Sequence, residues 1–154
     1  MADHAGVTGA ETAAIQDAKQ GKALYVEMRT PEGSTFSGGA TSLVVPGSKG
    51  SMGVLPKHAP LLSSLDVGFT RVRDPNGQEW KFVTGLGFVE IQHNKVLILV
   101  DFADDVTDID VKRAEDARDR AKARLRSPGE DVDVARAEAA LHRASTRLHF
   151  ATHR

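Results

Sequence analysis

Short runs with apolar residues at every second position dominate the chain between residues 23 and 103. In the first run, Leu24, Val26 and Met28 alternate with Tyr25 and two charged residues. This two-residue period is typical of a strand with one buried face. Further apolar runs follow at 41–45, 52–55, 69–73, 79–83, 88–91 and 96–100. We therefore expect about eight to ten strands between 23 and 103, in a β-sandwich or flattened barrel that occupies residues 23–106.

Turn signals separate these runs and support the same interpretation. Asn76-Gly77 lies between two strand-like runs, which is a strong hairpin signal. His93-Asn94 lies between two others and predicts a second hairpin. Pro56 and Pro60 restrict the intervening segment to sheet edges and turns, because proline cannot donate a backbone hydrogen bond.

The pattern changes to that of helices after an acidic stretch that begins at Asp101. Thr107, with Asp110 three residues later, is similar to a helix capping box. Good helix formers continue to Arg126, where Ser127-Pro128-Gly129 interrupts them. Asp131 is then a candidate cap for a second helix that ends near residue 150. Because the connection is short, residues 107–150 predict an antiparallel helical hairpin.

Residues 1–22 carry almost no large apolar side chain, with Ile15 as the main exception. Such a stretch buries too little apolar surface to offset the entropy that it loses on ordering. We interpret residues 1–22 as a disordered or weakly helical extension, with a helix over 10–19 as the helical alternative.

The apolar residues of the two predicted helices are mostly alanines. The seams are Ala114, Ala117, Ala121 and Leu125 on the first helix and Val134, Ala137, Leu141, Ala144 and Leu148 on the second. Small residues bury little surface, and buried apolar surface contributes only about 25 cal/mol per Å². We infer that this hairpin docks on the β-rich part and can undock. A permanently packed hairpin fits the same pattern.

Arginines run beside both seams. They are Arg113, Arg120 and Arg124 on the first helix and Arg136, Arg143 and Arg147 on the second. Guanidinium groups pair bidentately with phosphates and carboxylates, so the stripe suits a phosphate or an acidic protein surface. A solvated face with local ion pairs, such as Asp116 with Arg120, explains the same spacing. Spacing by itself favours the solvated face.

Composition excludes several classes of function. The 154 residues carry a net charge of -1 and no cysteine, so bulk charge attracts neither nucleic acid nor an anionic membrane, and no thiolate is available for chemistry or metal binding. No apolar run is long enough to cross a membrane. His149 and His153 are four residues apart but lack a third ligand nearby, so we expect no metal site. Gly85-Leu86-Gly87 lacks the third glycine of a dinucleotide-binding loop. We find no set of catalytic residues and expect a protein that is not itself an enzyme.

Specific motifs narrow the choice. The β-rich part contains Phe36-Ser37-Gly38, the run GSMGVLPKHAPLL from Gly50 to Leu62, and the run GLGFVEI from Gly85 to Ile91. The helical part contains Ile109-Asp110-Val111-Lys112-Arg113-Ala114. These segments are similar to the patterns GxxGxxPxHAPLL, GGxxEV and [I/L]DxxRA of one family. From about residue 25 to residue 150, the chain resembles the epsilon subunit of bacterial F-type ATP synthases.

The resemblance implies a ten-stranded β-sandwich that binds the gamma subunit of the rotor and touches the ring of c subunits. His58 matches the loop histidine that faces the c ring. It also implies a mobile hairpin that either folds against the sandwich or extends along gamma to the catalytic β subunits, where it blocks ATP hydrolysis. The chain is then peripheral to the membrane, at the cytoplasmic face of the bacterial inner membrane.

In some members of the family, ATP binds the folded hairpin as a regulatory ligand, and no other cofactor is required. The residues of this chain that match the family's ATP site are Asp104, Asp110, Arg113, Ala114, Arg120, Arg143 and Arg147. Asp104 stands where nucleotide-binding members have glutamate, and the shorter side chain puts the affinity in doubt. Helical geometry also places Arg143 well around from the seam.

Two further departures are Ser51, where members often carry an acidic residue, and Leu86, where two glycines usually run together. Residues 1–22 have no counterpart. We expect a non-catalytic subunit of the rotor's central stalk that inhibits ATP hydrolysis. The alternative is a stand-alone β-sandwich binding module whose helical tail oligomerises, and capture of gamma in a stoichiometric complex would separate the two.

Overall fold

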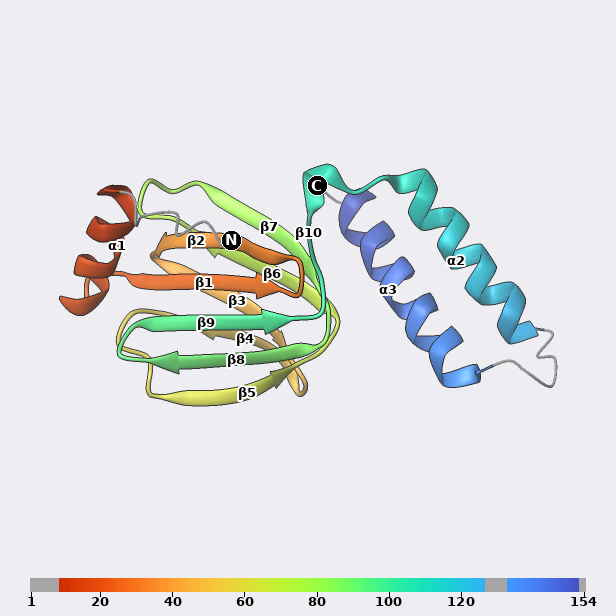
Figure 1. Ribbon diagram of the computed structural model, residues 1–154, viewed down its shortest axis with the longest axis horizontal. Coiled ribbons are helices and arrows are strands. Elements are labelled where there is room, and N and C mark those ends of the chain that lie inside the picture. The colour runs from red at the N-terminus through yellow and green to blue at the C-terminus, as the bar shows by residue number, and fades with distance from the viewer. Residues whose placement is uncertain (1–8, 127–132, 153–154) are drawn as a thin grey trace, which may run out of the picture.

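The computed structural model describes residues 9–126 and 133–152. Its strands are β1 (Leu24–Thr30), β2 (Gly33–Ala40), β3 (Ser42–Gly47), β4 (Gly50–Val54), β5 (Leu61–Leu65), β6 (Gly68–Arg73), β7 (Glu79–Thr84), β8 (Gly87–Gln92), β9 (Lys95–Val100) and β10 (Ala103–Asp105). Its helices are α1 (Gly9–Lys19), the short 3-10 helix η1 (Val106–Asp108), α2 (Val111–Arg126) and α3 (Val134–Thr152). A β-sandwich followed by a helical hairpin is the predicted fold, which is thereby confirmed (Figure 1).

The strands of the described residues form one strongly curved ten-stranded sheet that folds over itself. Its order is β10-β7-β6-β3-β5-β8-β9-β1-β2, and β4 pairs with β3 outside this path. Both predicted hairpins are present, because β6 pairs with β7 around Asn76-Gly77 and β8 pairs with β9 around His93-Asn94. The pairing of β1 with β9 is parallel, and it joins the first strand of the chain to the ninth.

The main core lies between the two layers of the folded sheet. It is built from the inward side chains of nearly every strand, which include the fully buried Leu24, Met28, Leu43 and Ile98. Thr70 and Thr84 are buried among them, and their hydroxyl groups are 2.9 Å apart and satisfy each other. The alternation in β1 therefore identifies the residues that face the core, but Tyr25 on the opposite face is also buried, because α1 covers it.

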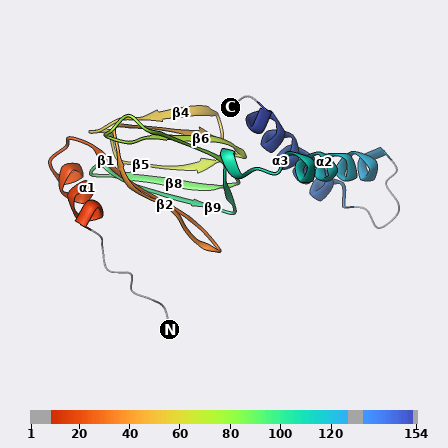
Figure 2. The ribbon, with the colours of Figure 1, turned by 90° about the horizontal axis from the view of Figure 1, so that it is seen from above.

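The hairpin packs against one end of the sandwich through a separate, smaller cluster. Its buried members are Val83, Val106, Ile109 and Ala151. Phe150 of α3 stacks on Phe69 of β6, with ring centroids 4.6 Å apart and planes at 16°. The rest of α2 and α3 extends away from the sandwich (Figure 2). The hairpin is thus attached at its base and contributes little to the main core.

Alanines form the interface between α2 and α3. Ala114 and Ala121 of α2 are buried, as are Ala137, Ala144 and Ala151 of α3. Val134, which we assigned to the seam, is 46% exposed. The predicted interruption at residues 127–129 lies outside the described residues.

Helix α1 covers the end of the sandwich opposite the hairpin (Figures 1 and 2). The Glu11 carboxylate accepts hydrogen bonds from the hydroxyl groups of Tyr25, at 2.6 Å, and Ser37, at 2.9 Å. Ala18 is buried, and its carbonyl accepts a hydrogen bond from the Asn94 amide at 3.0 Å. Of the two alternatives for this stretch, the structure therefore has the helix over Gly9–Lys19. Residues 1–8 lie outside the described residues.

Candidate functional site

The acidic stretch between the sandwich and α2 forms two consecutive caps. Asp105 accepts hydrogen bonds from the backbone and hydroxyl groups of Thr107, at 2.8 and 2.7 Å, and so caps η1. Asp110 accepts from the backbone N–H of Arg113 at 3.0 Å and caps α2. The predicted capping box at Thr107 is therefore wrong, because Thr107 lies in η1 and the cap of α2 comes three residues later.

The cap of α3 is Asp133, whose carboxylate accepts from the backbone N–H of Arg136 at 3.0 Å. The sequence pattern predicts Asp131 for this role, but Asp131 lies outside the described residues. The predicted ion pair of Asp116 with Arg120 is also replaced, since the salt bridge found on α2 joins Arg118 to Asp119 at 2.8 Å.

A cleft of about 570 Å³ opens where β10, η1 and the bases of α2 and α3 meet. It is lined by Ala103, Asp104, Asp105, Asp108, Ile109, Asp110, Arg113, Ala114, Ala117, Arg120, Ala144 and Arg147. Three arginines and four aspartates thus face one space. Small alanines on both helices leave the room between them.

Arg147 closes one side of this cleft. Its Nε donates a 2.6 Å hydrogen bond to the Asp104 carboxylate, and its guanidinium lies 4.3 Å from the centre of the Phe102 ring. Both side chains are partly exposed, at 30% for Arg147 and 38% for Asp104. The pair therefore joins α3 to β10 while remaining accessible to a ligand.

The structure brings together six of the seven residues that match the family's ATP site. They are Asp104, Asp110, Arg113, Ala114, Arg120 and Arg147. Arg143 does not line the cleft. In a helix each residue turns by about 100°, so Arg143 points roughly a quarter-turn away from its neighbour Ala144, which does line it.

Sequence reasoning missed other lining residues, including Asp105, Asp108 and Ile109. They lie between the last residue of β10 and the start of α2, and this closeness to Asp104 and Asp110 in the chain is the signal that could have revealed them. Ala117 and Ala144 were assigned to the seam only, although small residues at a helix crossing also create space for a ligand.

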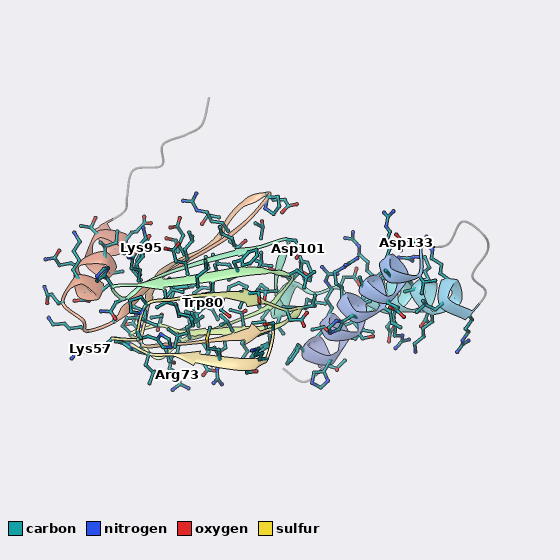
Figure 3. The ribbon with its side chains drawn as sticks, turned by 90° about the horizontal axis from the view of Figure 1, so that it is seen from below. Lys57, Arg73, Trp80, Lys95, Asp101 and Asp133 are labelled. Carbon is teal, nitrogen blue, oxygen red and sulfur yellow. The ribbon has the colours of Figure 1, made fainter. Side chains whose placement is uncertain are left out.

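His58 follows Lys57, which lies at the end of the sandwich that carries α1, opposite the hairpin (Figure 3). It follows a tight turn in which its backbone N–H donates to the Leu55 carbonyl at 3.1 Å. Its Nδ1 is 2.7 Å from the Ala59 carbonyl, so the ring donates a proton there. The residue that matches the c-ring contact is therefore separate from the residues that match the ATP site.

An exposed apolar stripe crosses the outer face of β5, β8 and β9. Phe88 is 58% exposed and pairs directly with Leu99, which is 47% exposed. Leu62, 71% exposed, pairs with Glu90 on the same face. Alternation did not reveal this stripe, because β8 and β9 carry large apolar residues on both faces.

Within the described ranges, no helix is long and apolar enough to span a membrane, and no group of three or more histidine, aspartate or glutamate side chains is arranged to hold a metal ion.

Two family models match most of the chain. The model described as "ATP synthase, Delta/Epsilon chain, beta-sandwich domain" matches residues 23–106, and "ATP synthase, Delta/Epsilon chain, long alpha-helix domain" matches residues 107–152. The ATP synthase epsilon chain of Pelotomaculum thermopropionicum is 46% identical over 104 residues, which are 68% of this chain and 77% of that protein. The epsilon chain of Desulforamulus reducens is 41% identical over 108 residues, which are 70% of this chain and 81% of that protein.

The fold is similar to that of chains in two solved structures. One is the Euglena gracilis mitochondrial ATP synthase (OSCP/F1/c-ring), with a TM-score of 0.72, 22% identity, and coverage of 80% of this chain and 78% of that one. The other is the central stalk and c ring of the Tetrahymena thermophila enzyme, with a TM-score of 0.50, 18% identity, and coverage of 84% and 94%. Both family models and the sequence relatives lead to one conclusion: the chain belongs to the ATP synthase delta/epsilon family, as a bacterial-type epsilon chain and a non-catalytic subunit of the synthase.

Proposed function

We propose that this epsilon chain couples the rotor to the catalytic head and restrains ATP hydrolysis through a hairpin whose docking ATP stabilises. The sandwich binds the gamma subunit and the c ring, and the undocked hairpin reaches the catalytic β subunits. The chain then lies peripherally at the cytoplasmic face of the bacterial inner membrane. The observation that carries the proposal is the cleft between β10 and the hairpin, with arginines from both helices.

The chemistry of the cleft supports a nucleotide as its ligand. Arg113 and Arg120 of α2 and Arg147 of α3 reach it from two helices. A guanidinium group holds phosphate oxygens bidentately. Three such groups therefore suit a triphosphate better than one would. The four aspartates provide acceptors for ribose hydroxyls and for an amino group. A volume of about 570 Å³ is within the range of small-ligand sites, roughly 300–1,000 Å³.

The position of the cleft makes the hairpin responsive to this ligand. Its walls belong to the sandwich, through Asp104, and to both helices. A ligand that contacts all three binds the docked form and loses its site when the hairpin leaves. Docking is then stabilised by RT ln(1 + [L]/Kd), or about 2.7 kcal/mol when the ligand is at 100 times its Kd. Only a small apolar cluster attaches the base of the hairpin to the sandwich. A stabilisation of this size can therefore shift the equilibrium between the docked and undocked hairpin.

Titration calorimetry of the full chain with ATP tests the proposed ligand. Wild type should bind, and Arg113→Ala should bind at least roughly tenfold more weakly, because a charged hydrogen bond to phosphate contributes about 1.5–3 kcal/mol. Arg118→Ala is the matched control, since Arg118 lies on the same helix but outside the cleft and pairs with Asp119. Absence of heat up to several millimolar ATP would exclude the ATP-sensing role and leave the inhibitory role standing.

Reconstituted synthase tests inhibition separately. A chain that ends before residue 107 keeps the sandwich and lacks the hairpin, so ATP hydrolysis should rise relative to the full chain. Equal rates with the two chains would exclude hairpin inhibition.

The exposed stripe supports the contact with gamma. Phe88, Leu99 and Leu62 expose apolar surface to water on one face. Burial of this surface by a partner is favourable, so the face suits a protein contact. Phe88→Ser should therefore reduce capture of purified gamma. Val134→Ser, at a partly exposed apolar residue of the hairpin, is the control and should leave capture unchanged. If Phe88→Ser leaves the capture of gamma unchanged, gamma must bind another face of the sandwich.

A further inference from the structure

The ring of Phe102, between β9 and β10, carries the guanidinium group of Arg147. The Arg147 Cζ lies 4.3 Å from the centre of this ring. Asp101, the preceding residue, lies at the end of the sandwich that faces the hairpin (Figure 3). Phe102 also packs against the small apolar cluster at the base of the hairpin. The ring thus belongs to the sandwich, whereas the cation above it belongs to α3.

The backbone of Gly85 makes room for the Phe102 ring. A Cβ added at Gly85 would lie 2.5 Å from the Phe102 Cδ1 and 1.6 Å from the Asp101 Oδ1, so a larger residue would displace both side chains. The Gly85 N–H donates to the Phe102 carbonyl at 2.9 Å and fixes the Phe102 backbone at the same place. The ring is therefore a platform in a defined position.

Two contacts hold the Arg147 guanidinium in different ways. The Asp104 carboxylate accepts a 2.6 Å hydrogen bond from Nε, and the Phe102 ring lies against the group. Among the described residues, the two terminal nitrogens of Arg147 donate to no other acceptor. Arg147 lines the cleft, so these terminal N–H groups are the ones that a ligand there can use.

The other two arginines of the cleft are held less firmly. Within the described ranges, neither Arg113 nor Arg120 takes part in a salt bridge or lies over an aromatic ring. A long side chain that is ordered only on binding loses rotational freedom at that moment, which weakens the binding. Arg147 has already lost much of this freedom, so it is the arginine that is arranged in advance.

We propose that Phe102 is a positioning residue, which holds Arg147 in place for a polyphosphate and so sets the affinity of the docked hairpin for that ligand. The inference rests on the proposed function, because it concerns the ligand of the same cleft. The negative potential of an aromatic face attracts a cation, so the contact depends on the charge of Arg147. The ligand then meets a guanidinium group that needs little further ordering.

Two other roles for Phe102 make different predictions. Direct stacking of the ring on a base is one of them, but Phe102 is not among the residues that line the cleft, whereas Arg147 is. Simple apolar packing at the base of the hairpin is the other. Apolar packing depends neither on the charge of Arg147 nor on the electron density of the ring, and these two dependences can be measured.

Fluorination of the ring tests the role of its face. Trifluorophenylalanine at position 102 keeps the shape of the ring nearly unchanged and removes most of the negative potential of its face. In the full chain without nucleotide, hydrogen exchange of the α3 amides through hairpin opening should accelerate by roughly three- to tenfold. In an Arg147→Met background, which keeps an apolar stem and removes the charge, fluorination should have no effect.

Phe69 provides the matched control. Its ring belongs to the same apolar cluster but stacks on Phe150, not on a cation. Trifluorophenylalanine at position 69 should therefore change the exchange of the α3 amides equally with and without Arg147→Met. Dependence on Arg147 at position 102, together with independence at position 69, is the signature of a cation held over a ring.

Titration calorimetry of the same chains measures the effect on the ligand. Fluorination at position 102 should raise the Kd for ATP by roughly three- to tenfold, and it should raise the Kd for inorganic tripolyphosphate by a similar factor. The second probe has no base or ribose, so a common effect means that the ring acts on the phosphates through Arg147. With Arg147→Met, fluorination should not change either Kd.

The outcomes separate the inference from the function on which it rests. If wild type binds ATP and fluorination at position 102 changes nothing, or acts equally with Arg147→Met, the positioning role is overturned and the proposed function stands. An effect on ATP but not on tripolyphosphate, or a lower Kd after fluorination, overturns it as well. If wild type binds neither probe, the proposed ligand is overturned and the inference with it.

Discussion

Arg147 of α3 and Asp104 of β10 share a 2.6 Å hydrogen bond that joins the hairpin to the sandwich across the cleft. The same guanidinium lies over the Phe102 ring. A phosphate that enters the cleft therefore either displaces Asp104 from Arg147 or accepts hydrogen bonds from the other N–H groups of the same guanidinium. The guanidinium that joins the hairpin to the sandwich is therefore also a group that the proposed nucleotide would bind.

A double-mutant cycle should measure this fastening. Asp104→Ala, Arg147→Ala and the double variant should give a coupling of about 0.5–1 kcal/mol in the free energy of hairpin opening, since both groups are partly exposed. Hydrogen exchange of the α3 amides provides the measurement. The exposed pair of Arg118 with Asp119 is the control, and its coupling should be close to zero. A coupling near zero for Asp104 with Arg147 would show that the pair does not hold the hairpin.

Phe150→Ala should release the hairpin more strongly. The change removes a ring stacked 4.6 Å from Phe69, and loss of a partly buried aromatic costs about 2 kcal/mol. Exchange of the α3 amides should accelerate accordingly. Global unfolding of the sandwich, followed through Trp80, the single tryptophan, should shift little. Leu125→Ala, at the far end of α2, is the control and should leave docking unchanged. A loss of the sandwich transition with Phe150→Ala would mean that hairpin and sandwich form one cooperative unit.

The single tyrosine reports the docking of α1 through its titration. Burial, and then the hydrogen bond to the Glu11 carboxylate, raise the pKa of Tyr25. The unfolded chain therefore ionises first, near pH 10. The stability that the neutral phenol contributes is complete below about pH 10 and is lost as the pH rises through the raised pKa.

Absorbance of the ionised phenol gives this pKa directly. Glu11→Gln should lower it towards the ordinary value, because a carboxylate that opposes phenolate formation is removed. Glu32→Gln, in the exposed turn after β1, should leave it unchanged. A wild-type Tyr25 that titrates at its ordinary value would contradict the docked arrangement of α1.

The strands could be predicted because one face of each is buried in a single core. Leu24, Val26 and Met28 alternate with polar residues for that reason. The turns at Asn76-Gly77 and His93-Asn94 could be predicted because turn formation depends on the turn residues themselves and not on distant contacts. Helix α1 gave no such signal. Its docking depends on Glu11, Tyr25 and Ser37, whose polar contacts leave no periodic pattern in the sequence.

The caps and the cleft show a second limit. Several aspartates lie between 101 and 110, and each can cap a helix, so sequence reasoning could not select Asp110 over Thr107. Six of the seven residues that the motif resemblance names line one cleft, and their binding of ATP stays a prediction. Arg143 does not line the cleft, because its side chain leaves α3 in a direction about 40° from that of Arg147.

The parallel pairing of β1 with β9 sets the order in which a growing chain can assemble. Tyr25 lies opposite Lys95, 70 positions later, so β1 emerges from the ribosome long before one of its two neighbours exists. Contacts between distant parts of a chain form slowly. Helix α1 depends on the same late event, because Asn94 lies in the turn immediately before β9. We therefore expect the N-terminal segment, although made first, to be the last part of the sandwich to reach its place.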